Sequence, residues 1–405
     1  MAEINPSKAE VVGLPLETEV SFVPMEAVGE YGGLHLDVSR SLSAIKDGYT
    51  YFRDGDVIVA KITPCFENGK GAIADGLLNG IGFGTTELHV LRPKPGLDSR
   101  FLFYVTLSTG FRKQGEAGMY GAGGQKRVSD EFVREFRLPI PPFPQQRAIT
   151  AFLDRETARI DALIAKKERL LELLEEKRTV LITRAVTKGL DPAVPMKETG
   201  AEWLGEVPAH WKVLPIGREI VLQRGVDITK DSQREGPIPV VSSGGVSSFH
   251  DRAVSAGPGV VVGRKGTAGA VYYVDTDFWP HDTTLWVKEF RGNHPRFVFY
   301  KLSSMNLSSF DTGTANPTLN RNLIHPVVVS WPPIDEQLAI ATYLDHQGER
   351  TDQLGARIRD AITLLREYRT ALISAAVTGQ IDVSKGGESS EDSKGLKSLL
   401  GRGAS

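Results

Sequence analysis

Basic and amide side chains in or beside glycine-rich turns are the residues of this chain best suited to bind a ligand. The turns are GMYGAGGQKR from Gly118, GRKGTAG from Gly263 and GTANPTLNR from Gly313. Lysine and arginine suit phosphates and guanine edges, asparagine and glutamine suit adenine edges, and glycine lets a backbone approach a groove closely. We therefore predict DNA contacts from ten residues, although exposed basic residues are more often plain solvated surface: Lys61, Lys70, Gln125, Lys126, Arg127, Arg264, Lys265, Asn316, Asn320 and Arg321.

Catalytic motifs are missing from the sequence. The GRKGTAG run at Gly263 lacks the spacing of a phosphate-binding Walker loop and reads better as a basic strand turn. The chain has no HExxH, GxSxG or EF-hand pattern, and no Asn/Asp-Pro-Pro-aromatic motif of amino-methyltransferases. Its 8 histidines form no metal-like pair, and a structural hydrogen bond is the better interpretation of the most site-like one, His281 beside Asp282. We expect no catalytic residue, no metal site and no cofactor of its own.

The composition is that of an ordinary globular protein. Of 405 residues, 40% are hydrophobic and 24% charged, and the length favours two or more domains. A net charge of −2 counts against a simple basic DNA binder, unless the charge is clustered or partners supply it. The single Cys65 excludes a disulfide framework. No run approaches a membrane span, and the start does not resemble a secretory signal, so we expect a cytoplasmic protein without membrane contact.

An internal repeat is the most informative feature of the chain. PPFPQQRAITAFLD from Pro141 aligns with PPIDEQLAIATYLD from Pro332, an offset of 332 − 141 = 191 residues. The match continues without a gap to Asp191 and Asp382, with about 22 of 51 positions identical. Such a unit is too long for a solenoid repeat. We infer a tandem duplication of a whole unit, each with a variable globular part followed by a shared helical part.

The shared part predicts a long amphipathic helix in each copy. Leu153, Ile160, Leu174 and Leu181 recur at helical spacing in the first copy, and no Gly or Pro interrupts residues 154–187. Each helix would have about 34 residues and a length of roughly 50 Å. Pairing of the two apolar stripes as a coiled coil would bury both. The alternative is that each helix packs only on its own globular part.

The two globular parts are strand-rich and follow one plan. Short β-type runs separated by Gly, Pro and Asp recur in both, and RFLFY from Arg100 resembles RFVFY from Arg296. The loops carrying Gln125–Arg127 and Asn320–Asn322 fall at corresponding places, which favours DNA contact by one or both loops. We predict an α+β protein with a pseudo-twofold repeat, in which two β-rich mixed domains are separated by two long helices that form a coiled coil. The predicted segments are domains 1–140 and 198–331, helical spacers 141–190 and 332–382, and a disordered tail 383–405.

These motifs resemble the specificity subunits of type I restriction–modification systems. The resemblance rests on PIPPFPQQRAITAFLD from Pro139 and on the ending AAVTGQID from Ala375. VSFVPMEAVGEYGGL from Val20, DGDVIVAKITPCFENGKG from Asp54 and GFGTTELHVLRP from Gly82 look like one type of target-recognition domain, and ETGAEWLGEVPAHWKVLPIG looks like the entry to a second. It covers nearly the whole chain before about residue 383.

The resemblance implies a non-catalytic subunit that reads a bipartite site on double-stranded DNA. Each recognition domain would read one half-site, and the antiparallel helices would act as a ruler between them. Methyltransferase subunits would dock around the helices and supply chemistry with S-adenosylmethionine, and the resemblance leaves open whether a motor–nuclease subunit also joins. Two alternatives remain: an orphan or degenerate coiled-coil scaffold, and a fragment of a fused restriction–methylation enzyme.

One segment departs from the repeat. The second unit begins with EWLGEVPAHW from Glu202, and the first unit has no counterpart, because the chain starts at MAEINPSKAEV. We expect either that the first recognition domain lacks its opening strand or that the start is misassigned.

Overall fold

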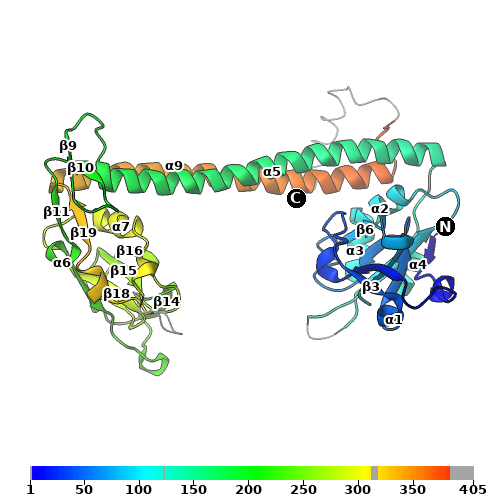
Figure 1. Ribbon diagram of the computed structural model, residues 1–405, viewed down its shortest axis with the longest axis horizontal. Coiled ribbons are helices and arrows are strands. Elements are labelled where there is room, and N and C mark those ends of the chain that lie inside the picture. Colours follow the sequence, from blue (N-terminus) through cyan, green and yellow to red (C-terminus); the bar gives the residue numbers. More distant parts are fainter. Residues whose placement is uncertain (1, 122–123, 312–317, 384–405) are drawn as a thin grey trace. The chain divides into compact units, whose positions relative to one another are not determined.

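The computed structural model describes residues 2–121, 124–311 and 318–383, and it divides the chain into two compact units. The first unit comprises Met1–Lys167 and Arg359–Ser405, and the second comprises Glu168–Ile358. The division cuts both long helices, so each unit contains one globular domain and one segment of each helix (Figure 1). The predicted tail lies outside the described residues after Val383.

The two predicted helices are present and are longer than expected. Helix α5 covers Phe143–Lys188, 46 residues, and α9 covers Ile334–Val377, 44 residues. We expected helix from about Asp154, but α5 begins directly after the double proline, with Pro144 in its first turn. Proline is tolerated there because the first N–H groups of a helix have no partner inside the helix.

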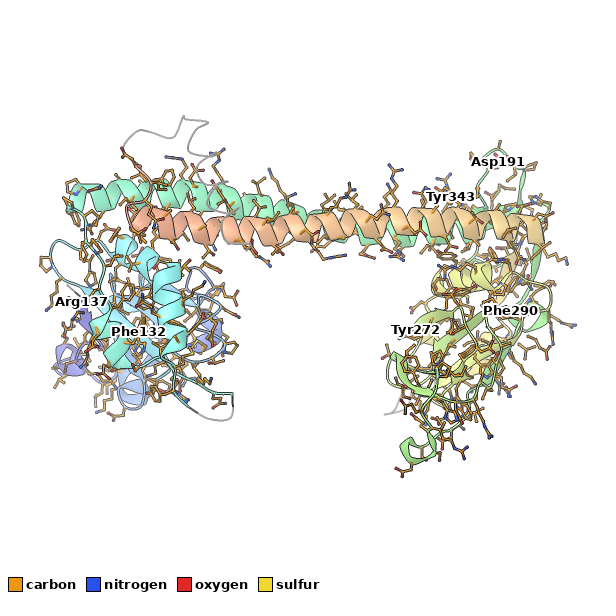
Figure 2. The ribbon with its side chains drawn as sticks, turned by 180° about the vertical axis from the view of Figure 1, so that it is seen from behind. Phe132, Arg137, Asp191, Tyr272, Phe290 and Tyr343 are labelled. Atoms are coloured by element: carbon orange, nitrogen blue, oxygen red, sulfur yellow. The ribbon has the colours of Figure 1, made fainter. Side chains whose placement is uncertain are left out.

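Within each unit, the segments of the two long helices run antiparallel and pack through the predicted stripe (Figure 2). Arg369 of α9 lies 3.0 Å from Asp161 of α5 in the first unit, and Arg178 of α5 lies 2.9 Å from Asp352 of α9 in the second. The two ion pairs are the same pair in the repeat, since both 369 − 178 and 352 − 161 equal 191. Within each unit, the buried stripe residues of the two helices belong to one apolar core. The predicted antiparallel pairing is therefore confirmed.

The domain of the first unit is built on two four-stranded sheets. Their strand orders are β1-β8-β5-β6 and β3-β2-β7-β4. All neighbours pair antiparallel except β2 and β7, which are parallel. The strands are β1 Ala2–Ile4, β2 Glu19–Val23, β3 Ser39–Ser41, β4 Thr50–Arg53, β5 Val57–Ala60, β6 Gly71–Ile73, β7 Ile81–Gly84 and β8 Leu88–Pro93. The helices are α1 Leu42–Ile45, α2 Ser99–Leu107, α3 Thr109–Ala117 and α4 Asp130–Glu135, with short 3₁₀ turns at Lys8–Val11, Met25–Ala27 and Leu78–Gly80.

The domain of the second unit repeats most of this plan. Its main sheet has the order β12-β18-β15-β16, and a three-stranded sheet has the order β14-β13-β17, again with one parallel pair. Two further small sheets pair β10 with β9 and β11 with β19. The strands are β9 Met196–Glu198, β10 Glu206–Pro208, β11 Lys212–Pro215, β12 Val221–Arg224, β13 Ile238–Ser242, β14 Gly245–His250, β15 Gly259–Gly263, β16 Val271–Val274, β17 Trp279–Pro280, β18 Thr284–Glu289 and β19 Val328–Trp331. The helices are α6 Ile216–Glu219, α7 Pro295–Ser303 and α8 Arg321–Ile324, with 3₁₀ turns at Lys230–Ser232 and Leu307–Phe310.

The strands of the two domains follow in the same sequence. The set β1, β2, β3, β5, β6, β7 and β8 matches β12 to β18 one by one, with the same neighbours in the sheets. Among the described residues, strand β4 is extra in the first unit, and the β10–β9 and β11–β19 pairs are extra in the second. The shared architecture predicted from the sequence is thus confirmed. The segment without a counterpart, Glu202–Trp211, carries β10 and leads directly into β11.

A buried glutamine joins each domain to its long helix. Gln146 donates to the carbonyls of Gly96 and Pro141, both at 2.9 Å, and accepts from the N–H of Asp98 at 2.8 Å. Gln337, its repeat partner, accepts from the N–H of His294 at 2.8 Å. It also donates to a side-chain oxygen of Asn293 and to the carbonyl of Pro332.

A second repeated contact lies about two helical turns further along each long helix. Asp154 of α5 accepts from Tyr104 of α2 at 2.8 Å and pairs with Arg100. Asp345 of α9 accepts from Tyr300 and Arg296 of α7, both at 2.6 Å. The RFLFY-type motif and the LD pair at the helix start are therefore two halves of one polar joint.

Candidate nucleic-acid interface

Two of the predicted DNA-binding residues occupy the same position in the two units. Lys61 directly follows β5, its N–H donates to the carbonyl of Glu87 at 2.9 Å, and its carbonyl accepts from Val128 at 2.8 Å. Arg264 directly follows β15, its N–H donates to Thr283 at 2.8 Å, and its carbonyl accepts from the N–H of Leu319 at 2.9 Å. Each basic residue therefore lies where the glycine-rich loop returns to the sheet.

This geometry corrects the predicted alignment of the loops. Because Val128 matches Leu319, Gln125–Arg127 corresponds to residues 316–318 and not to Asn320–Asn322. Asn320 instead caps α8, accepting from the N–H of Asn322 at 2.9 Å, just as Ser129 caps α4. The prediction was wrong because it matched the loops by residue type. The offset of 191 found for the helical repeat continues through Val128 and Leu319, and through the caps Ser129 and Asn320.

A groove of about 800 Å³ lies at this corner of the second unit. It brings Arg264, Asn320 and Arg321, three of the predicted residues, together with Arg224 at the end of β12 and Asp282 before β18. Three guanidinium groups line the groove and Asp282 pairs with one of them, Arg224, at 2.9 Å. Such a lining can bind an anionic group such as a phosphate and can offer donors to base edges.

The charges in the groove influence one another. Burial lowers the pKa of Arg264, and the nearby charge of Arg224 lowers it further, while Asp282 opposes both. One guanidinium nitrogen of Arg264 is buried without a hydrogen-bond partner among the described residues. Burial raises the pKa of Asp282, but the hydrogen bond from Arg224 and the neighbouring His281 bring it below its usual value. Asp282 therefore stays ionised and holds Arg224 in place.

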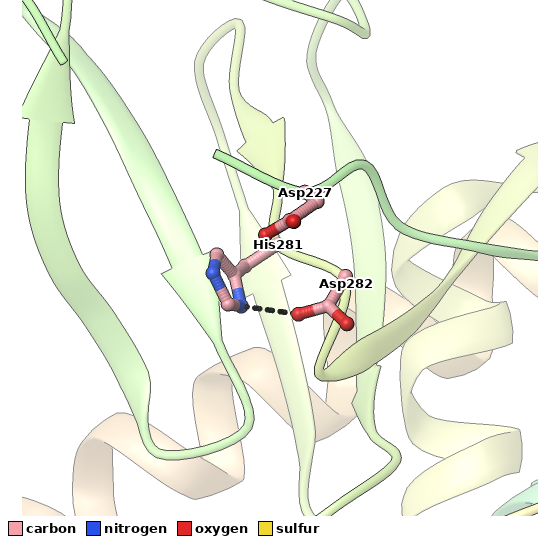
Figure 3. Close-up of side chains that lie close together, drawn as sticks. All are labelled: Asp227, His281 and Asp282. Carbon is pink, nitrogen blue, oxygen red and sulfur yellow. Dashed lines mark ion pairs between the residues drawn. The ribbon is translucent and has the colours of Figure 1, made fainter. Parts of the chain in front are cut away.

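His281 lies beside Asp282 and Asp227, two residues that line the groove (Figure 3). Its Nδ1 is 3.0 Å from the hydroxyl of Thr283 and 3.2 Å from Asp282. One ligand atom from each of the three residues falls within 4.8 Å of the others. Because Arg224 already neutralises Asp282 and Asp227 is exposed, the cluster is better described as a polar turn that shapes the groove.

The predicted residues of the first unit are used differently. Arg127 forms a bidentate ion pair with Glu87, with N···O distances of 2.8 and 2.9 Å. This pair raises the pKa of Arg127 and lowers the pKa of Glu87. Lys70 donates to the carbonyl of Met25 at 3.1 Å. Gln125 and Lys126 have exposed side chains.

Lys265 and Asn316 are the remaining predicted residues of the second unit. Lys265 is exposed and forms a backbone bridge with Thr318, whereas Asn316 lies outside the described residues. Arg224 and Asp282 were not among the predicted contacts. They lie 58 residues apart in the sequence, and only the pairing of β12 with β18 brings them together, so no local pattern could have indicated the pair.

The chain belongs to the family described as the type I restriction modification DNA specificity domain. The family model matches twice, over residues 19–173 and 213–364, one match for each copy of the repeat. The family resemblance found in the sequence is therefore confirmed.

Individual relatives agree with this family. The chain is 46% identical over 151 residues to the type I restriction enzyme EcoAI specificity subunit of Escherichia coli, and 43% identical over 151 residues to the EcoEI specificity subunit. Each match covers 37% of this chain and 25% of the relative, so the aligned part is about a quarter of each relative's length.

Solved structures share the fold. A chain from a study of complex assembly and conformational transition of the type I R-M system superposes with a TM-score of 0.76 at 15% identity, covering 90% of this chain and 93% of that one. The HsdS subunit from Thermoanaerobacter tengcongensis gives 0.54 at 17% identity, covering 90% and 92%. Among the described residues, no helix combines the length and the apolar character that crossing a membrane requires.

Proposed function

We propose that this chain is the DNA-reading subunit of a type I restriction–modification complex and that each of its two domains reads one half of a split DNA site. The observation that carries the proposal is the repeated basic corner. Lys61 and Arg264 have equivalent backbone contacts in two otherwise divergent domains of a DNA-specificity family. Equivalent placement with different surroundings fits two readers with one docking mode and two target sequences.

The chain itself would do no chemistry. The corner residues are suited to binding, and the reaction would belong to methyltransferase partners that use S-adenosylmethionine. A motor–nuclease subunit is a further partner that the family suggests. We expect the chain to work in the cytoplasm, because a restriction–modification complex acts on the DNA of a bacterial cell.

The long helices offer a repeated surface for such partners. Leu163 and Leu364 are 47% and 60% exposed in the first unit, and Leu173 and Leu354 are both 44% exposed in the second. The repeat offset of 191 relates Leu163 to Leu354 and Leu173 to Leu364. Apolar residues exposed on helices at repeat-related positions suit two copies of one partner, each meeting the same pair of leucines. Two methyltransferase subunits are the occupants that we propose.

A methylome tests the proposed function. The chain is expressed with the methyltransferase encoded beside it in a host that lacks adenine methylation, and modified bases are mapped over the genome. We expect one new split motif, two short half-sites around a fixed unspecified spacer. Absence of new methylation when both proteins are soluble and co-purify would favour a degenerate scaffold, and methylation by the purified chain alone would favour a fused enzyme.

Matched variants assign the half-sites in the same measurement. Arg264→Ala should weaken or relax one half-site, and Lys61→Ala should affect only the other, because each residue belongs to a different domain. A single contact to a base is worth about 1–3 kcal/mol of discrimination. Arg159→Ala, an exposed arginine of α5 away from both corners, is the control. An effect of either corner variant on both half-sites would contradict independent readers.

A helix insertion tests whether the helices set the spacer. Seven residues, two helical turns, are inserted in both helices at matched positions, after Lys167 and after Ile358. We expect a longer spacer and unchanged half-sites. An unchanged spacer, with the protein folded and active, would contradict the ruler.

A further inference from the structure

The first unit has an open apolar cavity where the second unit is filled by a strand. The cavity measures about 500 Å³. It is lined by β1, β8, α2 and the segment that enters α5, through Ile4, Leu91, Phe101, Val105, Leu138 and Ile140. In the second unit the equivalents of Leu91 and Phe101 are Val287 and Phe297. They belong to one buried core with Trp211 and Ile216, and the partly buried Leu214 packs against this core.

The backbone edge beside this cavity is unpaired. In the second unit, β19 pairs antiparallel with β11 over four residues, from Val328 opposite Pro215 to Trp331 opposite Lys212. The matching segment of the first unit, Arg137–Ile140, forms no strand pair with any described residue. The backbone N–H groups of Arg137, Leu138 and Ile140 likewise donate to no described group. An exposed edge of this kind is a template for strand addition.

The side chains at this edge are less polar in the first unit than in the second, which favours binding of an apolar segment. The second unit buries Lys301 in this region, where it donates to the hydroxyl of Ser330 at 3.0 Å and to a carbonyl of α5. The equivalents in the first unit are Val105 and Pro139, which carry no polar side-chain atom. Ser330 is fully buried, whereas Pro139 is exposed.

We propose that this edge and cavity form a binding site for one extended apolar peptide strand, with the chemistry that Trp211–Ile216 has in the second unit. The strand would pair antiparallel with Arg137–Ile140, through the N–H groups of Leu138 and Ile140, because alternate residues of an antiparallel pair face the partner strand. It would place an aliphatic side chain in the cavity beside Phe101. The inference concerns a peptide-binding site and does not depend on the DNA-reading proposal.

A peptide titration tests the site. The probe is a labelled synthetic peptide with the sequence of residues 210–217, HWKVLPIG, added to the full chain. We expect saturable one-to-one binding, and amide hydrogen exchange of Leu138 and Ile140 should slow by roughly tenfold or more, as expected for newly formed backbone hydrogen bonds. The segment Val328–Trp331 serves as an internal reference that is protected with or without the peptide.

Control variants separate the site from unspecific adhesion. A peptide carrying Leu214→Asp should bind at least about tenfold more weakly, because a carboxylate would enter an apolar cavity. In the protein, Leu138→Lys should weaken binding and Pro139→Lys should not, since neighbours in an extended segment face opposite sides. The proposal is overturned if no saturable binding occurs up to about millimolar peptide, or if the amides of Leu138 and Ile140 are already protected in the free chain.

Discussion

The globular domains of the two units share one order of strands. They differ in how the sheet edge next to the long helices is covered. The second domain closes there with β11, which covers the apolar core, and with the buried Trp211. The first domain leaves the equivalent edge unpaired among the described residues and adds β4 to its other sheet. The helix start and its polar joint are therefore common to both units. Among the described residues, a strand that covers the edge of the domain is present in the second unit alone.

The buried lysine of the second domain illustrates the same difference. Lys301 is fully buried, and burial lowers its pKa to about 7. Its ammonium group has two oxygen partners, Val186 of α5 and Ser330 of β19. The closing strand pair thus brings a polar contact with the helix, which the first domain replaces with valine and proline.

Removal of the tryptophan that accompanies the closing strand should have the largest effect. Trp211 is 1% exposed and donates to Glu336 of α9 at 2.8 Å. Trp211→Ala should lower the free energy of unfolding of the second unit by about 3–5 kcal/mol, measured by hydrogen exchange of its strands. The first unit should be unaffected, because its described residues include no equivalent tryptophan.

Trp203 provides the matched control. It lies in the same connecting segment but is 57% exposed, so Trp203→Ala should change stability by less than about 0.5 kcal/mol. Equal destabilisation of both units by Trp211→Ala would show that they do not unfold separately and would break the comparison.

Substitution of the joint glutamines should have a smaller and symmetrical effect. Gln146→Leu and Gln337→Leu each leave buried backbone groups without partners, so each should destabilise its own unit by about 1–3 kcal/mol. Denaturant unfolding followed by unit-resolved hydrogen exchange measures both. Gln145→Leu, at an exposed neighbouring position, is the control. A large effect in only one unit would mean that the joint is not shared.

Much of the architecture could be predicted from the sequence because it depends on local pattern. The 191-residue repeat, the helical spacing of Leu153 and Ile160, and the common RFLFY-type motif all lie in short windows, and the structure uses each of them as expected. Helix length was underestimated because the pattern was read from its regular part only, and the first turn after a double proline carries little of the apolar stripe.

The candidate site was only partly predictable, because it is assembled from distant residues. Residue type alone picked out Lys61 and Arg264, but their equivalence became visible through backbone hydrogen bonds to Glu87 and Thr283. The loop correspondence was placed four residues too far along the chain in the second copy, because the loops were matched by residue type and not by the offset of 191 that relates Val128 to Leu319.

The sequence by itself determined the duplicated plan, the amphipathic helices and the family, because apolar periodicity and repeated motifs are properties of neighbouring residues. Only the tertiary structure decided that Arg224 joins Arg264 and Arg321 in one groove, that Asp161 meets Arg369, and that the edge at Arg137–Ile140 is open. The physical reason is that strand pairing and helix packing bring together residues tens to hundreds of positions apart, and these contacts depend on the whole fold rather than on local propensity.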